Sequence, residues 1–420
     1  MRNTAERKVI NMRAGFGRAE ITPPLGVELA GFGYYLGRKC ESVRDPLYAR
    51  AVLIEDGKEK MLLVSCDVLG LSRRIADRIL EEAEELGISR DHVLIVSVHT
   101  HTGPAVIYHL GCGETDEDYL SALGDRILPA LRQAAEDLAE VSRLRFIRAP
   151  LEGDYFYNRA APEGPVDRDA RGFLMERTGR TPILIGSAAC HGVFLGRATC
   201  VSADFSGAFH RLCGEAGILS LYLNGLCGDI DPLRPSEQRM EEFGRLLFET
   251  LREPERELPR TLEGGRLPWT LRLRRFSREE IRGQAEAAVR RYGSAEEPAA
   301  RAALRWEEEM LLREDKLQAE EPGDAAYCVL GGIPILALPF EGFTETGRIF
   351  RRLIGMEDAL VLGCAEELLG YLPTRDEYDR DSYAARESFF LYRRLPPLIG
   401  EAERMGEQMA EQLALRKAGR

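Results

Sequence analysis

Two histidines at the end of an apolar run are the residues whose type and spacing most directly indicate chemistry. His99 and His101 follow the run over 93–98, which is rich in β-branched residues and typical of a strand buried on both faces. Alternate residues of an extended chain point the same way, so we expect both imidazoles to face one pocket. Imidazole binds metals and acts as an acid or base near neutral pH. The pair alone also fits two hydrogen-bonded histidines that only stabilise the end of a strand.

The pattern of a buried strand, a polar side chain and then Gly or Pro recurs along the chain. It delivers His99, His191, Glu341 and, a few residues past its strand, Tyr371. Ligand sites of open α/β sheets lie beyond the carboxyl ends of the strands, where residues distant in sequence meet. Two imidazoles and a carboxylate suit Zn²⁺ and leave one position for water or substrate. The chain has only six histidines, and three of them follow two of the predicted strands.

The elements that must position these residues predict an α/β fold. We expect a single large domain over 1–420, with mixed β-sheets flanked by helices and the metal site at the carboxyl ends of the strands. Asp56-Gly57 and Gly331-Gly332 each lie between apolar runs, which predicts two tight hairpins. The segment around Tyr155 to Ala160 has no clear period and is predicted to be a loop. Amphipathic helices are expected over 72–87, 116–141, 236–251, 343–353 and 400–416.

A segment of different composition interrupts this pattern at about 278–321. It is rich in Ala, Glu and Arg and is predicted to form one or two charged helices inserted into the domain. Three interpretations remain open at this point, namely a solvated surface hairpin, a lid and an oligomer contact.

Composition limits the class of protein and its partners. The 420 residues are 44% hydrophobic and 30% charged, with a net charge of −12, which argues against nucleic acid or an anionic membrane as a partner. The nine cysteines show no close-spaced pairs, and the first residues lack an apolar signal segment, so we expect a cytoplasmic protein. We further expect a small-molecule substrate and no stable membrane association, and a homo-oligomer remains open.

Five groups of polar and Gly/Pro-rich motifs are spread along nearly the whole chain. They are His99-Thr-His-Thr-Gly-Pro, Tyr157-Asn-Arg, His191-Gly-Val-Phe-Leu-Gly followed by Ser202-Ala-Asp, Pro339-Phe-Glu with Gly347-Arg, and Gly370-Tyr-Leu-Pro-Thr-Arg-Asp-Glu-Tyr with Tyr383. In type and order they resemble the motifs of the neutral/alkaline non-lysosomal ceramidase family. We therefore identify a short, soluble, bacterial-type member related to the catalytic domain.

The resemblance implies a zinc amidase with one Zn²⁺ per chain. On the family pattern the metal ligands would be His99, His191, Glu341 and Tyr371. The residues lining the reacting carbonyl would be His101, Arg159 and Tyr383.

The chain departs from the family at Asp231, which stands where the family has a nucleophilic serine. We therefore expect metal-activated water to attack the C–N amide bond of a small or soluble substrate. Asp231 would orient or deprotonate that water, and His101 and Tyr383 would stabilise the oxyanion. The alternatives are an ester or lactone hydrolase that uses the same metal site, and a metal-binding protein that has lost catalysis.

Overall fold

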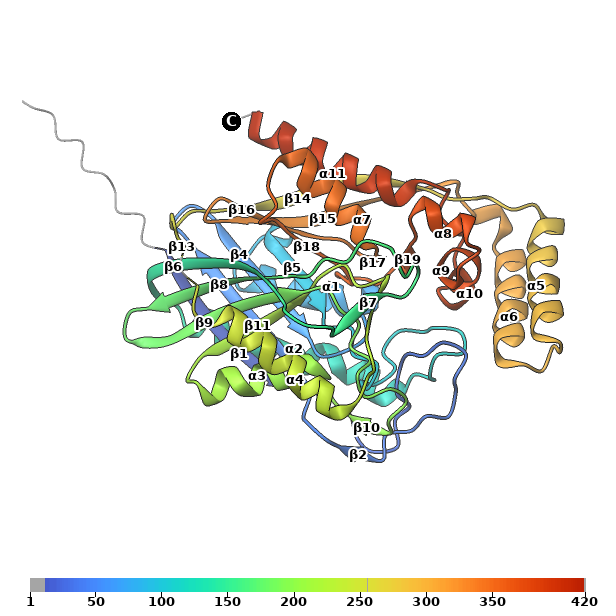
Figure 1. Cartoon of the computed structure of the whole chain (residues 1–420), viewed down its shortest axis with the longest axis horizontal. Coiled ribbons are helices and arrows are strands. Elements are labelled where there is room, and N and C mark those ends of the chain that lie inside the picture. The colour runs from blue at the N-terminus through green and yellow to red at the C-terminus, as the bar shows by residue number, and fades with distance from the viewer. Residues whose placement is uncertain (1–11, 255, 419–420) are drawn as a thin grey trace, which may run out of the picture.

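Four layers of secondary structure make up the chain in the computed structural model, which describes residues 12–254 and 256–418. From one side to the other they are helices, a four-stranded sheet, a nine-stranded sheet and further helices (Figure 1). The predicted α/β class with mixed sheets is thereby confirmed. The terminal segment in which we found no signal sequence lies outside the described residues.

The nine-stranded sheet holds the chain's N-terminal half. Its main path runs in the order β11-β9-β8-β6-β1-β3-β4-β5, and β13 pairs with β6. The sheet curls so that its end strands, β11 and β5, contact each other. Next to that contact, the Ser65 hydroxyl of β4 donates to the Tyr222 carbonyl of β11 at 2.6 Å. The strands are β1 (Arg13–Glu20), β3 (Tyr48–Glu55), β4 (Lys60–Cys66), β5 (Val93–Ser97), β6 (Ala139–Pro150), β8 (Asp169–Arg177), β9 (Arg180–Ala188), β11 (Leu219–Asn224) and β13 (Arg256–Leu258).

The four-stranded sheet packs face to face on the nine-stranded sheet. It has the order β14-β15-β16-β18, and its apolar side chains share one core with those of β3, β4, β5 and β9. Its other face is covered by α7 (Thr344–Ile354) and α11 (Glu401–Ala418), the top layer of Figure 1. The strands are β14 (Leu262–Arg272), β15 (Glu320–Leu330), β16 (Ile333–Ala337) and β18 (Leu360–Leu362).

Four helices cover the outer face of the nine-stranded sheet. Two of them, α1 (Arg73–Glu85) and α2 (Glu117–Glu136), pack on β1, β3, β4 and β5. The other two, α3 (Phe205–Glu215) and α4 (Glu237–Leu251), pack on β8, β9 and β11. The predicted extension of the second helix to 141 is wrong, because β6 begins at Ala139. Neither α3 nor β8 was predicted, and the two glycines of α3 weaken its helical pattern.

The charged segment forms a helical hairpin between two paired strands. Its helices, α5 (Arg278–Tyr292) and α6 (Pro298–Leu312), connect β14 to β15, which pair along their whole length. The hairpin projects from the body at the right of Figure 1, beside α8 (Arg375–Asp379), α9 (Tyr383–Arg386) and α10 (Ser388–Leu391). Trp306 of α6 is fully buried and packs against Phe389 and Phe390 of α10.

Three small strand pairs lie outside the two sheets. They are β2 (Ser42–Val43) with β10 (Cys200–Val201), β7 (Phe156–Asn158) with β12 (Ile230–Pro232), and β17 (Glu341–Gly342) with β19 (Tyr371–Leu372). The prediction of a loop around Tyr155 is therefore wrong in part, because Phe156–Asn158 forms the strand β7. Its aromatic residues pair with β12, a partner distant in sequence that no local pattern indicates.

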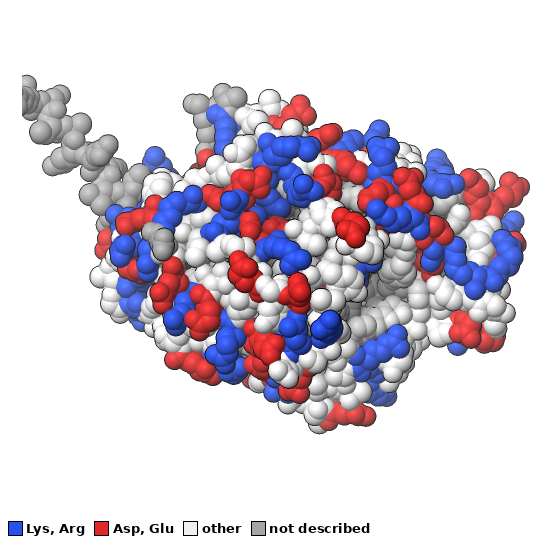
Figure 2. Space-filling model, viewed as in Figure 1, with Lys and Arg blue, Asp and Glu red and all other residues white. Residues whose placement is uncertain are grey.

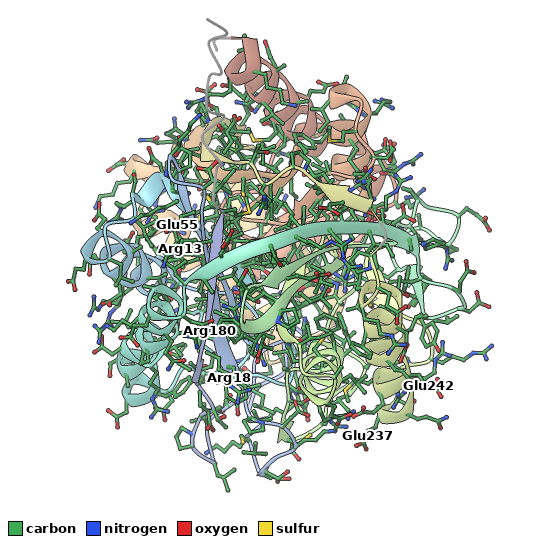
Figure 3. The ribbon with its side chains drawn as sticks, turned by 90° about the vertical axis from the view of Figure 1, so that its left-hand side faces the viewer. Arg13, Arg18, Glu55, Arg180, Glu237 and Glu242 are labelled. Carbon is green, nitrogen blue, oxygen red and sulfur yellow. The ribbon has the colours of Figure 1, made fainter. Side chains whose placement is uncertain are left out.

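The surface mixes charges of both signs. Figure 2 shows Lys and Arg interspersed with Asp and Glu, and a hollow beside the region of α8 to α10. Many charges pair across strands, as Arg13 does with Glu55 at 2.8 Å between β1 and β3 (Figure 3). Within the described part of the chain, no helix combines the length and the apolar character that crossing a bilayer requires.

Close packing of α2 on β1 generates a stability prediction. A Cβ added at Gly15 would lie 2.0 Å from the Ala134 carbonyl oxygen, which is backbone and cannot move aside. Gly15→Ala should therefore lower the free energy of unfolding by about 1–3 kcal/mol or more, measured by urea denaturation. Gly283→Ala in α5 is the control, since its added Cβ meets open space and should stabilise by about 0.5–1 kcal/mol. Equal effects of the two substitutions would contradict this account of the packing.

Candidate metal centre

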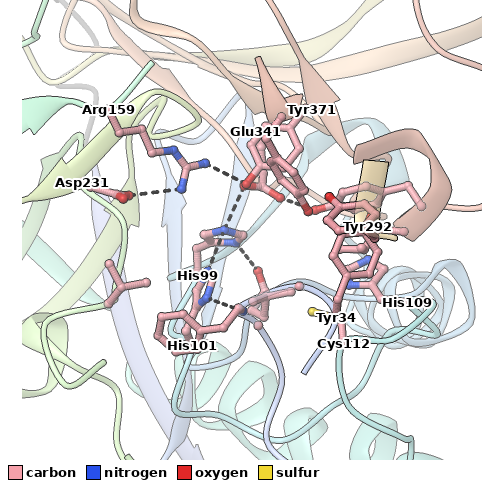
Figure 4. Close-up of a pocket in the computed structure, with 18 residues that line it drawn as sticks. Tyr34, His99, His101, His109, Cys112, Arg159, Asp231, Tyr292, Glu341 and Tyr371 are labelled. Atoms are coloured by element: carbon pink, nitrogen blue, oxygen red, sulfur yellow. Dashed lines mark hydrogen bonds and ion pairs between the residues drawn. The ribbon is translucent and has the colours of Figure 1, made fainter. Parts of the chain in front are cut away.

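A buried carboxylate between imidazoles forms the centre of the predicted site (Figure 4). Glu341 Oε2 lies 3.2 Å from His99 Nε2 and 3.2 Å from His191 Nε2. His101 Nε2 lies 3.4 Å from His99 Nε2. All four side chains are buried. Three imidazole nitrogens and one carboxylate oxygen thus converge, and their chemistry fits a borderline-soft divalent cation such as Zn²⁺.

The outer nitrogens of two histidines are already engaged by backbone carbonyls. His99 Nδ1 donates to the Leu69 carbonyl at 2.7 Å, and His191 Nδ1 donates to the Cys227 carbonyl at 2.6 Å. A carbonyl only accepts, so each Nδ1 carries a proton. Each Nε2 faces Glu341, and an imidazole with one nitrogen bonded to a carbonyl and the other turned toward the site is typical of metal-ligating histidines.

His101 has the opposite tautomer. Its Nδ1 accepts the Phe32 backbone N–H at 3.3 Å, so its proton sits on Nε2, which points toward His99 Nε2. The loop passes close enough because Gly31 has no side chain; a Cβ there would lie 2.3 Å from His101 Nδ1. His101 therefore presents a proton on Nε2 to the site, whereas His99 and His191 each carry a proton on Nδ1, outside it.

The two histidines of the central motif converge by a turn and not by strand alternation. β5 ends at Ser97, and His99 has a left-handed φ of 62°. His99 N–H donates to the Val68 carbonyl at 3.0 Å, and His101 N–H donates to the Gly192 carbonyl at 3.0 Å. The expectation that an extended chain aims both imidazoles the same way is wrong in its geometry. The shared pocket arises because the chain folds back over the end of the sheet.

Two thiols lie on the Nδ1 side of the His99 ring and form, with that nitrogen, a second group of possible metal ligands. Cys227 and Cys364 are buried, and their sulfurs lie within 4.8 Å of a His99 nitrogen and of each other. This group would need His99 Nδ1, which lies 3.4 Å from the Cys364 sulfur. That nitrogen already donates to the Leu69 carbonyl, so the Nε2 side is the better metal site.

The β7–β12 ribbon carries Arg159 and Asp231 to the opposite wall. Asp231 pairs in register with Tyr157, and Arg159 directly follows β7. Arg159 Nη1 donates to Asp231 Oδ1 at 3.2 Å, and Nη2 donates to the Tyr371 hydroxyl at 2.8 Å. Asp229 accepts from the backbone N–H and hydroxyl of Thr344. One guanidinium therefore connects Asp231 to a tyrosine beside Glu341.

Tyrosines surround the carboxylate from the C-terminal part of the chain. Tyr371 lies in register with Glu341 in the β17–β19 pair and hydrogen bonds with it. The Tyr392 hydroxyl donates to Glu341 Oε1. The Tyr383 ring lies 6.1 Å from that of Tyr371 and 6.4 Å from that of Tyr34, centroid to centroid. Tyr392 was not predicted, because its place at the end of an apolar helical run resembles an ordinary core tyrosine.

Burial and neighbouring charges shift the pKa values of the site. Burial acts to raise the pKa of Glu341, but His99 and His191 outweigh it and hold that pKa well below its usual range. Burial, reinforced by His99 and His191, lowers the pKa of His101, so this imidazole is neutral. Burial opposes the charge of Arg159, but Tyr371, Asp231 and Glu341 outweigh it and hold the pKa high. The wall therefore keeps a permanent cation next to the carboxylates.

One cavity of about 360 Å³ unites the predicted residues. Seven of the eight line it, and His191 lies beneath its wall with no exposed surface. The lining also includes residues that sequence analysis missed, namely Phe32, Tyr34, His109, Cys112, Tyr292 and Tyr392. Tyr292 ends helix α5, and the others lie in loops, where no chemical motif marks them.

Comparison with known proteins tests the family resemblance. Residues 12–159 match the family model described as neutral/alkaline non-lysosomal ceramidase, N-terminal. The fold matches the crystal structure of neutral ceramidase from Pseudomonas aeruginosa with a TM-score of 0.74 and 16% identity, over 97% of this chain and 75% of that one. A ceramidase complexed with C2 gives a TM-score of 0.74 and 16% identity, over 97% and 76%. The resemblance to the neutral/alkaline ceramidases is confirmed.

The ceramidase resemblance supports a general class of reaction. It implies a hydrolase and suggests cleavage of an amide bond. The structural matches at 16% identity establish the ceramidase fold.

The two groups of possible ligands generate a prediction about metal content. Purified protein should contain about one Zn²⁺ per chain, measured by inductively coupled plasma mass spectrometry. His99→Ala and His191→Ala should each remove it, and Glu341→Gln should weaken binding less because an oxygen ligand remains. The double variant Cys227→Ser, Cys364→Ser is the control and should keep its metal. If the cysteine variant lost its metal and His191→Ala kept it, the ion would be bound by the two thiols and His99 Nδ1, which would contradict the prediction.

Proposed function

We propose that this protein is a zinc-dependent hydrolase that cleaves a C–N amide bond in a small or soluble substrate. The observation that carries the proposal is the convergence of Glu341, His99 and His191 at the wall of a cavity that Arg159 and Tyr383 also line. With Tyr371, the first three would hold the metal. A Zn²⁺ ion at such a site would supply a Lewis acid for the substrate carbonyl and make water more acidic.

The chain's own residues would bind and orient the reacting carbonyl. His101 presents its Nε2 proton to the site and could donate to the negatively charged oxygen that develops in the transition state. Tyr383 lines the same cavity and is the second proposed donor. Arg159 is held by Asp231 and Tyr371, so it adds a fixed positive charge at the wall without losing entropy when substrate arrives.

Asp231 is proposed to act as the general base. Its carboxylate lines the cavity and is partly exposed, so a water molecule can reach it. Arg159 fixes its Oδ1, and Oδ1 lies 3.6 Å from His191 Nδ1. A carboxylate in this position could orient water and accept its proton as the water oxygen bonds to the carbonyl carbon. It could then pass that proton to the substrate nitrogen, which leaves as an amine when the C–N bond breaks. No acyl group would then be transferred to the protein.

The size of the cavity supports a small substrate. Its volume of about 360 Å³ is at the lower end of the range of roughly 300–1,000 Å³ for ligand pockets.

All nine cysteines are free, which supports our proposal of a cytoplasmic location.

Matched substrates test the reaction class. Short acyl amides and the corresponding esters and lactones should be offered to the purified protein without detergent, and the amides should be hydrolysed. Turnover of the esters or lactones alone would show that the site hydrolyses esters and not amides. Efficient cleavage of long-chain ceramide with the soluble amides ignored would contradict the proposed substrate class. If no substrate in the series is cleaved by zinc-loaded protein, a binding role replaces the catalytic one.

Asp231→Asn tests the base. The variant should keep its metal but lower kcat by roughly 10²–10⁴, the usual contribution of a general base. Asp118→Asn, an exposed carboxylate in the first turn of α2, is the control and should behave as wild type. One turnover in ¹⁸O-water should place the label only in the product acid. Label in Asp231 itself would make the carboxylate a nucleophile, and near-normal activity of Asp231→Asn would remove the base role.

A further inference from the structure

The helical hairpin contributes directly to the wall of the catalytic cavity. Tyr292, the last residue of α5, lines the cavity together with Tyr34, and their ring centroids lie 6.4 Å apart. Tyr292 is 36% exposed, so it stands at the rim between the cavity and solvent. In Figure 4, both tyrosines lie on the side opposite Arg159 and Asp231. A substrate group that extends away from those two residues would therefore meet Tyr292.

A buried carboxylate holds Tyr292 in place. Glu387 has no exposed surface and accepts a hydrogen bond from the Tyr292 hydroxyl. It also accepts from Arg291 Nη1 at 3.2 Å and from Arg386 Nε at 2.6 Å. The Tyr34 hydroxyl donates to the Glu387 backbone carbonyl at 3.4 Å. These contacts join the end of α5, the loop that carries Tyr34 and the junction between α9 and α10.

The same junction carries two tyrosines of the proposed site. Tyr383 begins α9, and Tyr392 directly follows α10. Tyr34 contacts Tyr383 edge to face at a centroid distance of 6.4 Å, so a continuous aromatic wall runs from Tyr292 at the rim to Tyr383. The wall is stiff, because a buried carboxylate bonded to two guanidinium groups is costly to separate from its partners.

We propose that Tyr292 determines how long a substrate group the cavity accepts, and that Glu387 is the positioning residue that holds it at the rim. The inference rests on the proposed amide hydrolysis and narrows its substrate class to amides with a short acyl group. With its hydroxyl tied to Glu387, the ring cannot swing aside to admit a long alkyl chain. A longer chain would have to break a buried, charge-assisted hydrogen bond.

Chain-length profiles of binding and turnover test this inference. The probes are butyric, octanoic and lauric acids, measured by calorimetry on the metal-loaded protein, and the amides of the same acids, measured by turnover. Wild type should prefer the butyryl compounds. Tyr292→Ala should shift the preference toward the octanoyl and lauroyl compounds by at least about tenfold in the ratio of binding constants and of kcat/KM, mainly through KM. Tyr292→Phe keeps the ring but removes the hydroxyl that Glu387 holds, so it should broaden the profile toward longer chains, less than Tyr292→Ala does.

Two further variants separate the specific role from general damage to the hairpin. Leu304→Ala, on the same hairpin but outside the cavity lining, should leave the profile unchanged. Glu387→Gln should increase hydrogen exchange at the end of α5 and broaden the profile toward longer chains. An unchanged profile in Tyr292→Ala, a wild-type preference for lauroyl compounds, or no binding of any acid would overturn the inference. If no amide is cleaved but Tyr292→Ala still shifts acid binding, the reaction assignment fails while the role of Tyr292 stands.

Discussion

The buried charge of Glu341 is the constraint on which the rest of the site depends. A carboxylate removed from water is stable only if other groups replace its hydration, by hydrogen bonds, opposite charge or metal coordination. Here His99 and His191 face one oxygen, and Tyr392 donates to the other. Two imidazoles and a phenol therefore stabilise one buried charge. Such an arrangement is expected where the charged group binds or reacts, and is unusual in a core that only packs.

The layers explain how these groups come together. His99 and His191 follow β5 and β9, both in the nine-stranded sheet, which curls so that its ends approach each other. Glu341 follows β16 of the four-stranded sheet and pairs with the strand of Tyr371. The proposed metal centre therefore lies where the two sheets meet, and each sheet contributes part of the proposed ligand set.

Sequence analysis predicted the parts of this arrangement that depend on local pattern. The hairpins at Gly57 and Gly331, the buried strand before His99 and the helix from Ser236 each have a short-range signal, and the structure contains all of them. The ligand candidates could be predicted because each follows a strand.

Other features depend on contacts between distant segments. The turn that places His99 at positive φ, the pairing of β7 with β12 and the position of Tyr392 have no periodic signature. The charged helices could be predicted as helices, but the contact of Tyr292 with Glu387 depends on tertiary packing.

The location of the metal tests the central claim most directly. Crystals of protein purified without added metal should be measured with X-rays on both sides of the zinc absorption edge, and an anomalous difference map calculated. The account predicts one peak per chain, within coordination distance of His99 Nε2, His191 Nε2 and a Glu341 oxygen. A peak between Cys227 and Cys364 would contradict it. So would the absence of any peak, if the same protein still hydrolyses amides in solution after treatment with a chelator.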